Sequence, residues 1–291
     1  MQIVYHCGVH GTDQDGLLKT LFQNRDWLSK NGIEAVSRSR HRGIFEKALG
    51  SLAGGPATRE MEEMMLDAIL ENDNTHRVIC SLPGFLGLPH RVISPNGLLE
   101  TSGDKMAALA NLFPNAEVEF FLALKNPATL VPYAIQNMPE KDYVRAMNGV
   151  PPETLRWGPA IQRMLRRIGD KRLVVWCHED TPLIWPEVVR RIATMPGDVA
   201  LKAGLQVLGD LLQPEGIHMI RDEMSKQERM TIATRREIFA AALQKYAITD
   251  KIEVEIDLPG WTQDLIDLMT EQYDEDVAEI AALPGVEFIA P

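Results

Sequence analysis

Residues 2–22 of this 291-residue chain read QIVYHCGVHGTDQDGLLKTLF. The stretch opens with an apolar run at Gln2–Cys7, passes through a loop that holds Gly8, Gly11 and Gly16, and continues into a leucine-rich segment. The apolar run predicts a short buried strand, and the three- and four-residue spacing of the leucines predicts a helix after it. A strand, a glycine loop and a helix N-terminus together offer backbone N–H groups and a helix dipole to an anion.

The same alternation of strand and helix continues along the chain. Short apolar strands separated by helices need crossover connections, and these favour a parallel sheet with helices on both faces. We therefore expect an α/β fold of three layers in a single elaborated domain over residues 1–291. The predicted strands are Gln2–Cys7, Arg77–Leu82, Glu117–Leu124, Arg172–Cys177 and Val286–Ile289, and the predicted helices are Gly16–Lys30, Thr58–Ile69 with Thr58 as its cap, Ser102–Phe113 with Ser102 as its cap, and one that opens at Pro182.

Two further regions are rich in helical patterns and are expected to form an added helical layer, at about 128–169 and 199–247. Ile252–Leu258 is expected to be extended, and Trp261–Ala281 to be an acidic amphipathic helix. Between Asp250 and Pro291 there are twelve acidic residues and one basic residue, which leaves 29 of each over positions 1–249. The body is therefore neutral, and a protein without a basic stripe is not expected to bind nucleic acid.

The three cysteines are too few and too far apart for a disulfide framework or a Cys-x-x-Cys zinc site, and they are expected to be small buried side chains. No apolar run is long enough to cross a bilayer. The N-terminus has neither the basic region nor the apolar region of a signal peptide. We expect a cytoplasmic protein with no membrane partner. The cysteines are Cys7, Cys80 and Cys177.

The first loop does not fit a nucleotide triphosphatase. A Walker-type loop that starts at Gly8 would place Gly-Lys-Ser/Thr at positions 13–15. The chain has Asp13, Gln14 and Asp15 there, so the lysine is missing and two carboxylates stand where phosphate charge would lie.

The loop does resemble that of bacterial sulfotransferase-like proteins, where a strand is followed by His-x-Gly-x-His-Lys-Thr-Gly-Thr-Thr and a leucine-rich helix. Residues 121–132, 174–185 and 273–291 are similar to other segments of this family, so the resemblance spans nearly the whole chain. It implies a P-loop-type α/β fold and transfer of a sulfuryl group from phosphoadenosine phosphosulfate to a hydroxyl acceptor that the sequence does not identify. The matching residues of the first segment are His6, Gly8, His10, Thr12, Leu17, Leu21, Asn24, Arg25, Leu28 and Gly32.

The resemblance also implies where the donor would bind. In the family, a lysine and threonines of the loop hold the 5′-phosphate, and an arginine and a serine hold the 3′-phosphate. By position, Gly11 replaces the lysine, Lys125 the arginine and Tyr133 the serine. The cofactor-binding candidates are therefore Gly8, Gly11, Thr12, Asp15, Gly16, Lys125 and Tyr133.

Asp13 and Asp15 oppose donor binding. Each carboxylate near a multiply charged donor costs roughly 1 kcal/mol or more. A helix N-terminus, in contrast, binds the protein's own carboxylate well. We therefore expect these acids to fill the phosphate cradle from within, with Asp15 as the helix cap, and phosphoadenosine compounds to bind poorly.

Three functions fit these observations. The first is a transferase in which His10 is the catalytic base, because a histidine near neutral pKa suits that role. The second is a non-catalytic descendant that binds a ligand or a partner protein. The third is a metal-dependent enzyme built on His6, His10 and His178, although their spacing matches no known metal motif and no metal is expected. In an extended segment, Arg38, Arg40 and Arg42 would lie on one side and supply charge for an anion.

Overall fold

The computed structural model describes residues 1–13, 15–41, 43–52 and 54–291. Within these ranges the chain forms a six-stranded parallel sheet in the order β2-β3-β1-β6-β7-β8, which confirms the predicted α/β fold class. Because β1 lies inside the sheet, the loop that follows it opens between two neighbouring strands. The strands are β1 (Gln2–His6), β2 (Ile33–Ala35), β3 (Arg77–Ser81), β6 (Glu117–Leu124), β7 (Arg172–Cys177) and β8 (Val286–Phe288).

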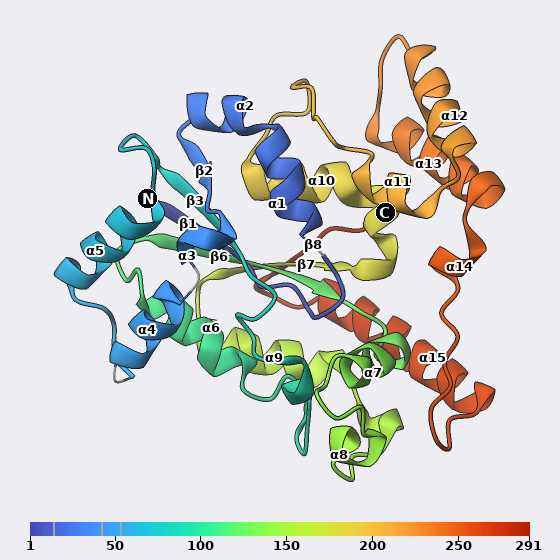
Figure 1. The fold of residues 1–291 in the computed structure, drawn as a ribbon, viewed down its shortest axis with the longest axis horizontal. Coiled ribbons are helices and arrows are strands. Elements are labelled where there is room, and N and C mark those ends of the chain that lie inside the picture. Colours follow the sequence, from blue (N-terminus) through green and yellow to red (C-terminus); the bar gives the residue numbers. More distant parts are fainter. Residues whose placement is uncertain (14, 42, 53) are drawn as a thin grey trace.

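Helices cover both faces of the sheet, as Figure 1 shows. Alternate residues of a strand point to opposite faces, and in β1 Val4 packs in one apolar cluster while Ile3 and Tyr5 pack in the other. The cluster around Val4 is covered by α1 (Gly16–Gln23), α2 (Arg25–Lys30) and α10 (Thr181–Ala193). The cluster around Tyr5 is covered by α5 (Arg59–Ile69), α6 (Ser102–Asn111), α9 (Trp157–Ile168) and α15 (Gln263–Ala281).

The helical region predicted at 199–247 is a separate layer with its own apolar cluster around Phe239. It consists of α11 (Gln206–Leu211), α12 (Pro214–Ser225) and α13 (Ile232–Tyr246). The region at 128–169 is different, because its longest helix, α9, belongs to the main core through buried Trp157 and Met164. The remaining elements are α3 (Arg38–His41), α4 (Ile44–Ser51), α7 (Pro127–Gln136), α8 (Tyr143–Met147), α14 (Thr249–Ile252), the antiparallel pair β4 (Ile93–Ser94) and β5 (Gly97–Leu98), and three 3-10 turns at Pro89–Arg91, Pro152–Thr154 and His178–Asp180.

Two sequence predictions about local structure are wrong. The helix predicted at Gly16–Lys30 is divided at Asn24, whose side chain donates to the carbonyl of Thr20 at 2.8 Å and so competes with the helical backbone. Ser102 is the first residue of α6 and not its cap, and its hydroxyl donates to the carbonyl of Leu99 at 2.6 Å. The segment predicted to be extended, Ile252–Leu258, begins at the last residue of α14, and Glu253 after it has an extended backbone. No strand of the described residues pairs with it.

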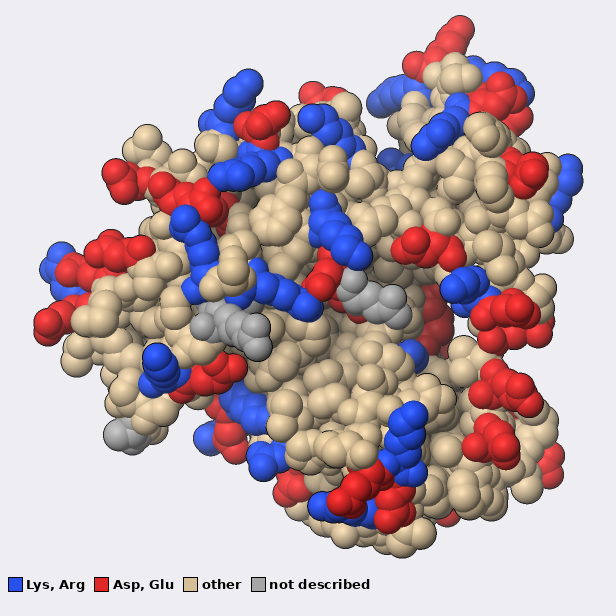
Figure 2. Space-filling model, in the orientation of Figure 1, with Lys and Arg blue, Asp and Glu red and all other residues tan. Residues whose placement is uncertain are grey.

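Helix α15 lies in the acidic C-terminal region, and it also binds the N-terminus of α9. The buried carboxylate of Asp276 accepts a hydrogen bond from the backbone N–H of Trp157 at 2.6 Å and from Nε of Arg156 at 3.0 Å. One acid of this helix therefore caps the N-terminus of α9. The other acids contribute to the red margin over α14 and α15 in Figure 2.

The cysteines and the helices agree with two further expectations. Cys7, Cys80 and Cys177 are free thiols and buried, and burial raises the pKa of each thiol. Among the described helices, none is both long and apolar enough to cross a bilayer.

Candidate functional site

The carboxyl ends of the parallel strands form the edge of the sheet where ligands bind in folds of this kind. Here the first loop follows β1. The last residue of β1, His6, pairs with Ser81 at the end of β3 and with Phe121 in β6. Figure 2 shows the surface hollowed between this loop and α14.

The first loop is closed by its own hydrogen bonds. Gly8 and Gly11 have positive φ values of 44° and 82°, which glycine adopts without strain. The hydroxyl of Thr12 donates to the carbonyl of Val9 at 2.7 Å, and the backbone N–H of Thr12 donates to the same carbonyl at 3.1 Å. The Thr12 hydroxyl, which the resemblance offers to a phosphate, is thus buried and used within the loop.

Asp13, and not Asp15, caps α1. Asp15 precedes the helix with φ 68°, in the left-handed region, and its side chain makes no capping hydrogen bond. A capping side chain normally needs an extended backbone to reach the helix N–H groups, which is why the predicted role of Asp15 is wrong. The carboxylate of Asp15 pairs with Arg38 instead. Asp13 Oδ1 accepts from the N–H of Leu17 at 2.8 Å.

The Asp13 carboxyl lies inside the loop, with 7% of its side chain exposed. Burial, with a smaller contribution from the charge of Asp15, raises the pKa of this carboxyl to about 7, although the hydrogen bond from the Leu17 N–H and the charges of Arg38 and Lys19 lower it. A Cβ placed on Gly16 would lie 3.3 Å from Asp13 Oδ1, so the helix start is closed around this group. Gln14, between the two acids, lies outside the described residues.

His6 lies beside Asp13 in a buried polar group. Its Nδ1 is 2.8 Å from the hydroxyl of Ser81 and 3.9 Å from Asp13 Oδ2, and its ring stacks on Trp176 with centroids 5.9 Å apart. Burial lowers the pKa of His6 to about 4. At neutral pH His6 is therefore uncharged, and it does not neutralise Asp13.

Three of the residues predicted to bind the sulfuryl donor, Gly11, Lys125 and Tyr133, lie close together beside the loop. A Cβ on Gly11 would lie 2.9 Å from the ring of Tyr133, so the ring packs directly on the glycine. Lys125 Nζ lies 5.0 Å from the centroid of the same ring, where a cation is attracted to the π face. Burial lowers the pKa of Lys125. The structure thus brings Gly11, Lys125 and Tyr133 together, with Tyr133 covering the loop.

The two remaining histidines lie apart from a metal-binding arrangement. His10 Nε2 donates to the carbonyl of Gly87 at 2.9 Å, and burial lowers the pKa of the ring. His178 Nδ1 is buried and has no hydrogen-bond partner among the residues that the structure describes. Burial and, to a smaller extent, the charge of Lys125 lower the pKa of this ring to about 4. Among the described residues, no three His, Cys, Asp or Glu side chains are arranged to hold a metal ion.

Sequence reasoning missed several polar groups at this edge. Trp176 Nε1, Trp185 Nε1 and the Thr181 hydroxyl are buried, and none has a hydrogen-bond partner within the described part of the chain. Buried donors of this kind are usually satisfied by water or a ligand. The signal in the sequence was an aromatic residue near the end of β7 and another in the helix that follows it.

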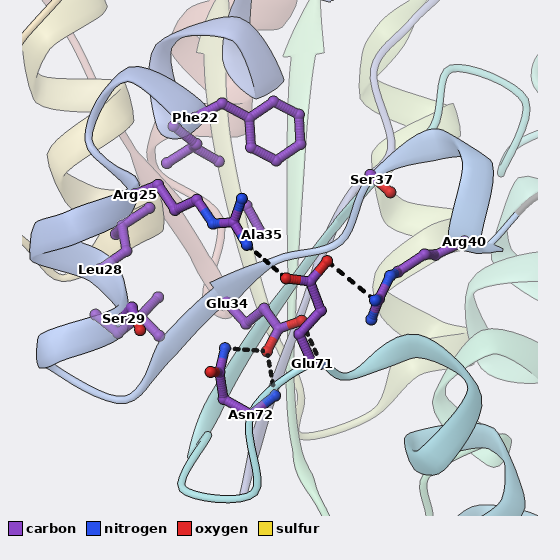
Figure 3. A pocket seen from close by; sticks show the side chains of 12 residues that line it. Phe22, Arg25, Leu28, Ser29, Glu34, Ala35, Ser37, Arg40, Glu71 and Asn72 are labelled. Atoms are coloured by element: carbon purple, nitrogen blue, oxygen red, sulfur yellow. Dashed lines mark hydrogen bonds and ion pairs between the residues drawn. The ribbon is translucent and has the colours of Figure 1, made fainter.

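The described residues of the arginine segment do not form one row of cations. Arg38 to His41 form the short helix α3, which turns successive side chains in different directions, so the predicted extended row is wrong. Arg40 instead lines a pocket of about 220 Å³ beside β2, drawn in Figure 3. There Glu71 pairs with both Arg25 and Arg40, at 2.6 and 3.0 Å. Arg42 lies outside the described residues.

The buried acid of the same pocket is also satisfied. Glu34 accepts hydrogen bonds from the backbone of Glu71 at 2.7 Å and from both nitrogens of Asn72 at 3.2 and 3.1 Å. The charges of this pocket are therefore paired within the protein.

Comparison with known proteins adds no further assignment. No protein-family model matches the chain, and no curated protein matches it.

Proposed function

We propose that this chain is a non-catalytic binding protein built on a sulfotransferase-like fold, and that it recognises a ligand at the carboxyl edge of the sheet without using phosphoadenosine phosphosulfate. The observation that carries the proposal is the capping bond from the Leu17 N–H to Asp13 at 2.8 Å. That N–H belongs to the helix end where a donor phosphate would bind. The carboxylate of Asp13 takes the place of the phosphate there.

The residues around the loop do not fit the donor. The family's lysine would stand at Gly11, where φ is 82° and the ring of Tyr133 leaves no room for a Cβ. The Thr12 hydroxyl is committed to the carbonyl of Val9. Lys125 stands where the family has its arginine, and a single amine cannot replace the bidentate contacts of an arginine. Arg38 also reaches the loop, but it is paired with Asp15.

The same edge retains features of a binding site. Trp176 and Trp185 each present a buried indole N–H, and Thr181 a buried hydroxyl, and the described residues offer no partner to any of the three. Such donors favour an uncharged polar ligand that carries hydrogen-bond acceptors. An acceptor would satisfy N–H and O–H groups that are costly to leave unpaired.

Sulfuryl transfer is the second candidate, and the meeting of Gly11, Lys125 and Tyr133 favours it. In that case His10 would be the base through Nδ1, since Nε2 is bonded to Gly87. This function requires the donor to bind, which the first proposal denies.

Restoring the family's residues separates the two candidates. We would compare binding of phosphoadenosine phosphate by the wild type and by the Asp13→Gly, Asp15→Thr variant, using calorimetry. The proposal predicts no saturable heat for the wild type and measurable binding only after both carboxylates are removed. A variant with two exposed acids changed, Asp26→Asn and Asp210→Asn, controls for net charge and should behave as the wild type.

The position of Lys125 gives a second check on any anion that binds to the restored variant. The Lys125→Ala change should then weaken its affinity, because this amine lies over the ring of Tyr133, which packs on Gly11 of the loop. Unchanged affinity would place the anion elsewhere.

A further inference from the structure

A second pocket lies on the seam between the sheet body and the helical addition. It occupies about 450 Å³ between α1 on one side and α11 and α12 on the other. Pockets that hold small molecules commonly have volumes of roughly 300–1,000 Å³ and lie where two packed units meet. Its apolar wall is formed by Ala203, Leu205, Gly209 and Ile217, and its two cations are Lys19 and Arg221.

The charge of this pocket is unbalanced. Lys19 projects from α1 and Arg221 from α12, and the described residues that line the pocket include no acid. Within the described part of the chain, neither cation makes an ion pair or a hydrogen bond. This differs from the pocket beside β2, where Glu71 neutralises both arginines. The charge of Lys19 acts on Asp13 in the first loop, but no carboxylate among the described residues lines this pocket. Two cations at one pocket of a protein with a net charge of −11 favour an anion.

The walls of the pocket are fixed without a ligand. Asn24 is 4% exposed, donates to the carbonyl of Lys202 at 2.9 Å and accepts from the Lys202 N–H at 3.0 Å. The Thr20 hydroxyl donates to Gln206 at 3.2 Å across the same seam. Ala203 follows Lys202 in the chain and lines the pocket. Its φ of 58° is one that a residue with a Cβ adopts only when its surroundings hold it there. The backbone of the pocket therefore needs little ordering on binding, and the exposed side chains of Lys19 and Arg221 are the groups that a ligand would order.

We propose that this pocket binds a small amphipathic anion, that is, an apolar body that carries one carboxylate, sulfate or phosphate group. The apolar body lies against Leu205 and Ile217, and the anionic group lies between Lys19 and Arg221. Burial of the apolar part supplies most of the affinity, and the two cations select the charged end. The site is separate from the first loop, and it does not depend on what binds there.

The test uses 8-anilinonaphthalene-1-sulfonate, a fluorescent amphipathic anion, with the full-length protein. We expect one saturable site, and at least a tenfold loss of affinity in the Lys19→Gln, Arg221→Gln variant. The control is Lys30→Gln, Arg229→Gln, which removes the same charge from exposed positions outside the pocket and should leave the affinity within twofold. Equal affinity in the pocket variant and the wild type would overturn the proposal.

A second variant tests the apolar wall by filling it. A Cβ on Gly209 would meet no atom within 4 Å, and Gly209 lines the pocket, so the side chain of Gly209→Phe starts without a clash and should occupy pocket space while the fold is kept. Dye binding should fall at least tenfold. The matched control, Gly50→Phe, alters another helical glycine with open space and should bind the dye normally. Undiminished binding to a folded Gly209→Phe protein would contradict the site.

Competition with the bound dye tests whether the ligand must be an anion and whether it is a free molecule or a lipid in a membrane. Decanoate should displace the dye, whereas uncharged decanol should do so at least tenfold less well. Phosphatidylglycerol vesicles should neither displace the dye nor sediment the protein, because the pocket holds one small molecule. Displacement by the vesicles would overturn the proposal, and so would equal potency of decanol and decanoate.

Discussion

Replacing Asp13 by Asn should change how the stability of the protein depends on pH. Asparagine keeps a side-chain oxygen that can accept from the Leu17 N–H, so the cap survives while the titrating group is removed. In the wild type, burial raises the pKa of this carboxyl from the ordinary 3.8 to about 7. The folded state then holds a proton that the unfolded state releases, so stability falls as the pH rises between these two values.

The size of the effect follows from the pKa. One pKa unit corresponds to about 1.4 kcal/mol, so from about pH 5.5 to about pH 8 the Asp13 carboxyl lowers the wild-type unfolding free energy by about 2 kcal/mol. His6 acts in the opposite direction. Its pKa of about 4 in the folded state makes stability rise between about pH 4 and its ordinary pKa of 6.5. In the wild type the contributions of Asp13 and His6 to the pH dependence of stability therefore partly cancel. The Asp13→Asn variant keeps only the contribution of His6.

The assay is urea unfolding at these two pH values for the wild type, Asp13→Asn and the exposed control Asp26→Asn. We expect Asp13→Asn to gain about 2 kcal/mol on the wild type when the pH is raised from about 5.5 to about 8, and Asp26→Asn to follow the wild type. Parallel pH profiles for Asp13→Asn and the wild type would refute the reasoning. They would mean that the carboxyl is not buried against the helix end.

Three further changes test other contacts. Asp276→Ala should lower the unfolding free energy by about 3 kcal/mol in urea titrations, because it removes the cap of α9 and leaves a buried N–H unpaired; a loss below about 0.5 kcal/mol would argue against the cap. Gly11→Ala should lower the melting temperature, because φ at this position is 82° and the new Cβ would clash with the ring of Tyr133. Adding Tyr133→Ala should recover part of that loss. Additive effects of the two changes would rule out the contact. Glu119→Gln should cost about 3 kcal/mol or more, measured by urea unfolding, because it leaves the buried guanidinium of Arg77 without its ion-pair partner at 2.6 Å; a neutral change would show that the pair is not buried as described.

The sheet could be predicted from sequence because its long strands are buried on both faces and read as continuous apolar runs. Glu117–Leu124 was predicted with the bounds that β6 has. Strand β2 was missed because its three residues, Ile33–Ala35, include an acid that is buried and satisfied by distant N–H groups. A run this short gives no periodic signal.

The candidate site was predicted only in part. The meeting of Gly11, Lys125 and Tyr133 followed from the positions carried over by resemblance, and the structure places them together. The choice of Asp15 as the cap failed because sequence does not give the backbone angles of a loop residue, and φ of 68° turns that side chain away from the helix. The role of a loop acid therefore depends on local dihedral angles that tertiary packing sets.

The central claim is that the Asp13 carboxylate takes the place of a donor phosphate at the start of α1. The most direct measurement is calorimetric titration of the wild-type protein with phosphoadenosine phosphate near neutral pH. The proposal predicts no saturable heat at millimolar ligand. A saturable isotherm with a micromolar Kd would contradict it, and would mean that Asp13 leaves the helix end to admit the phosphate.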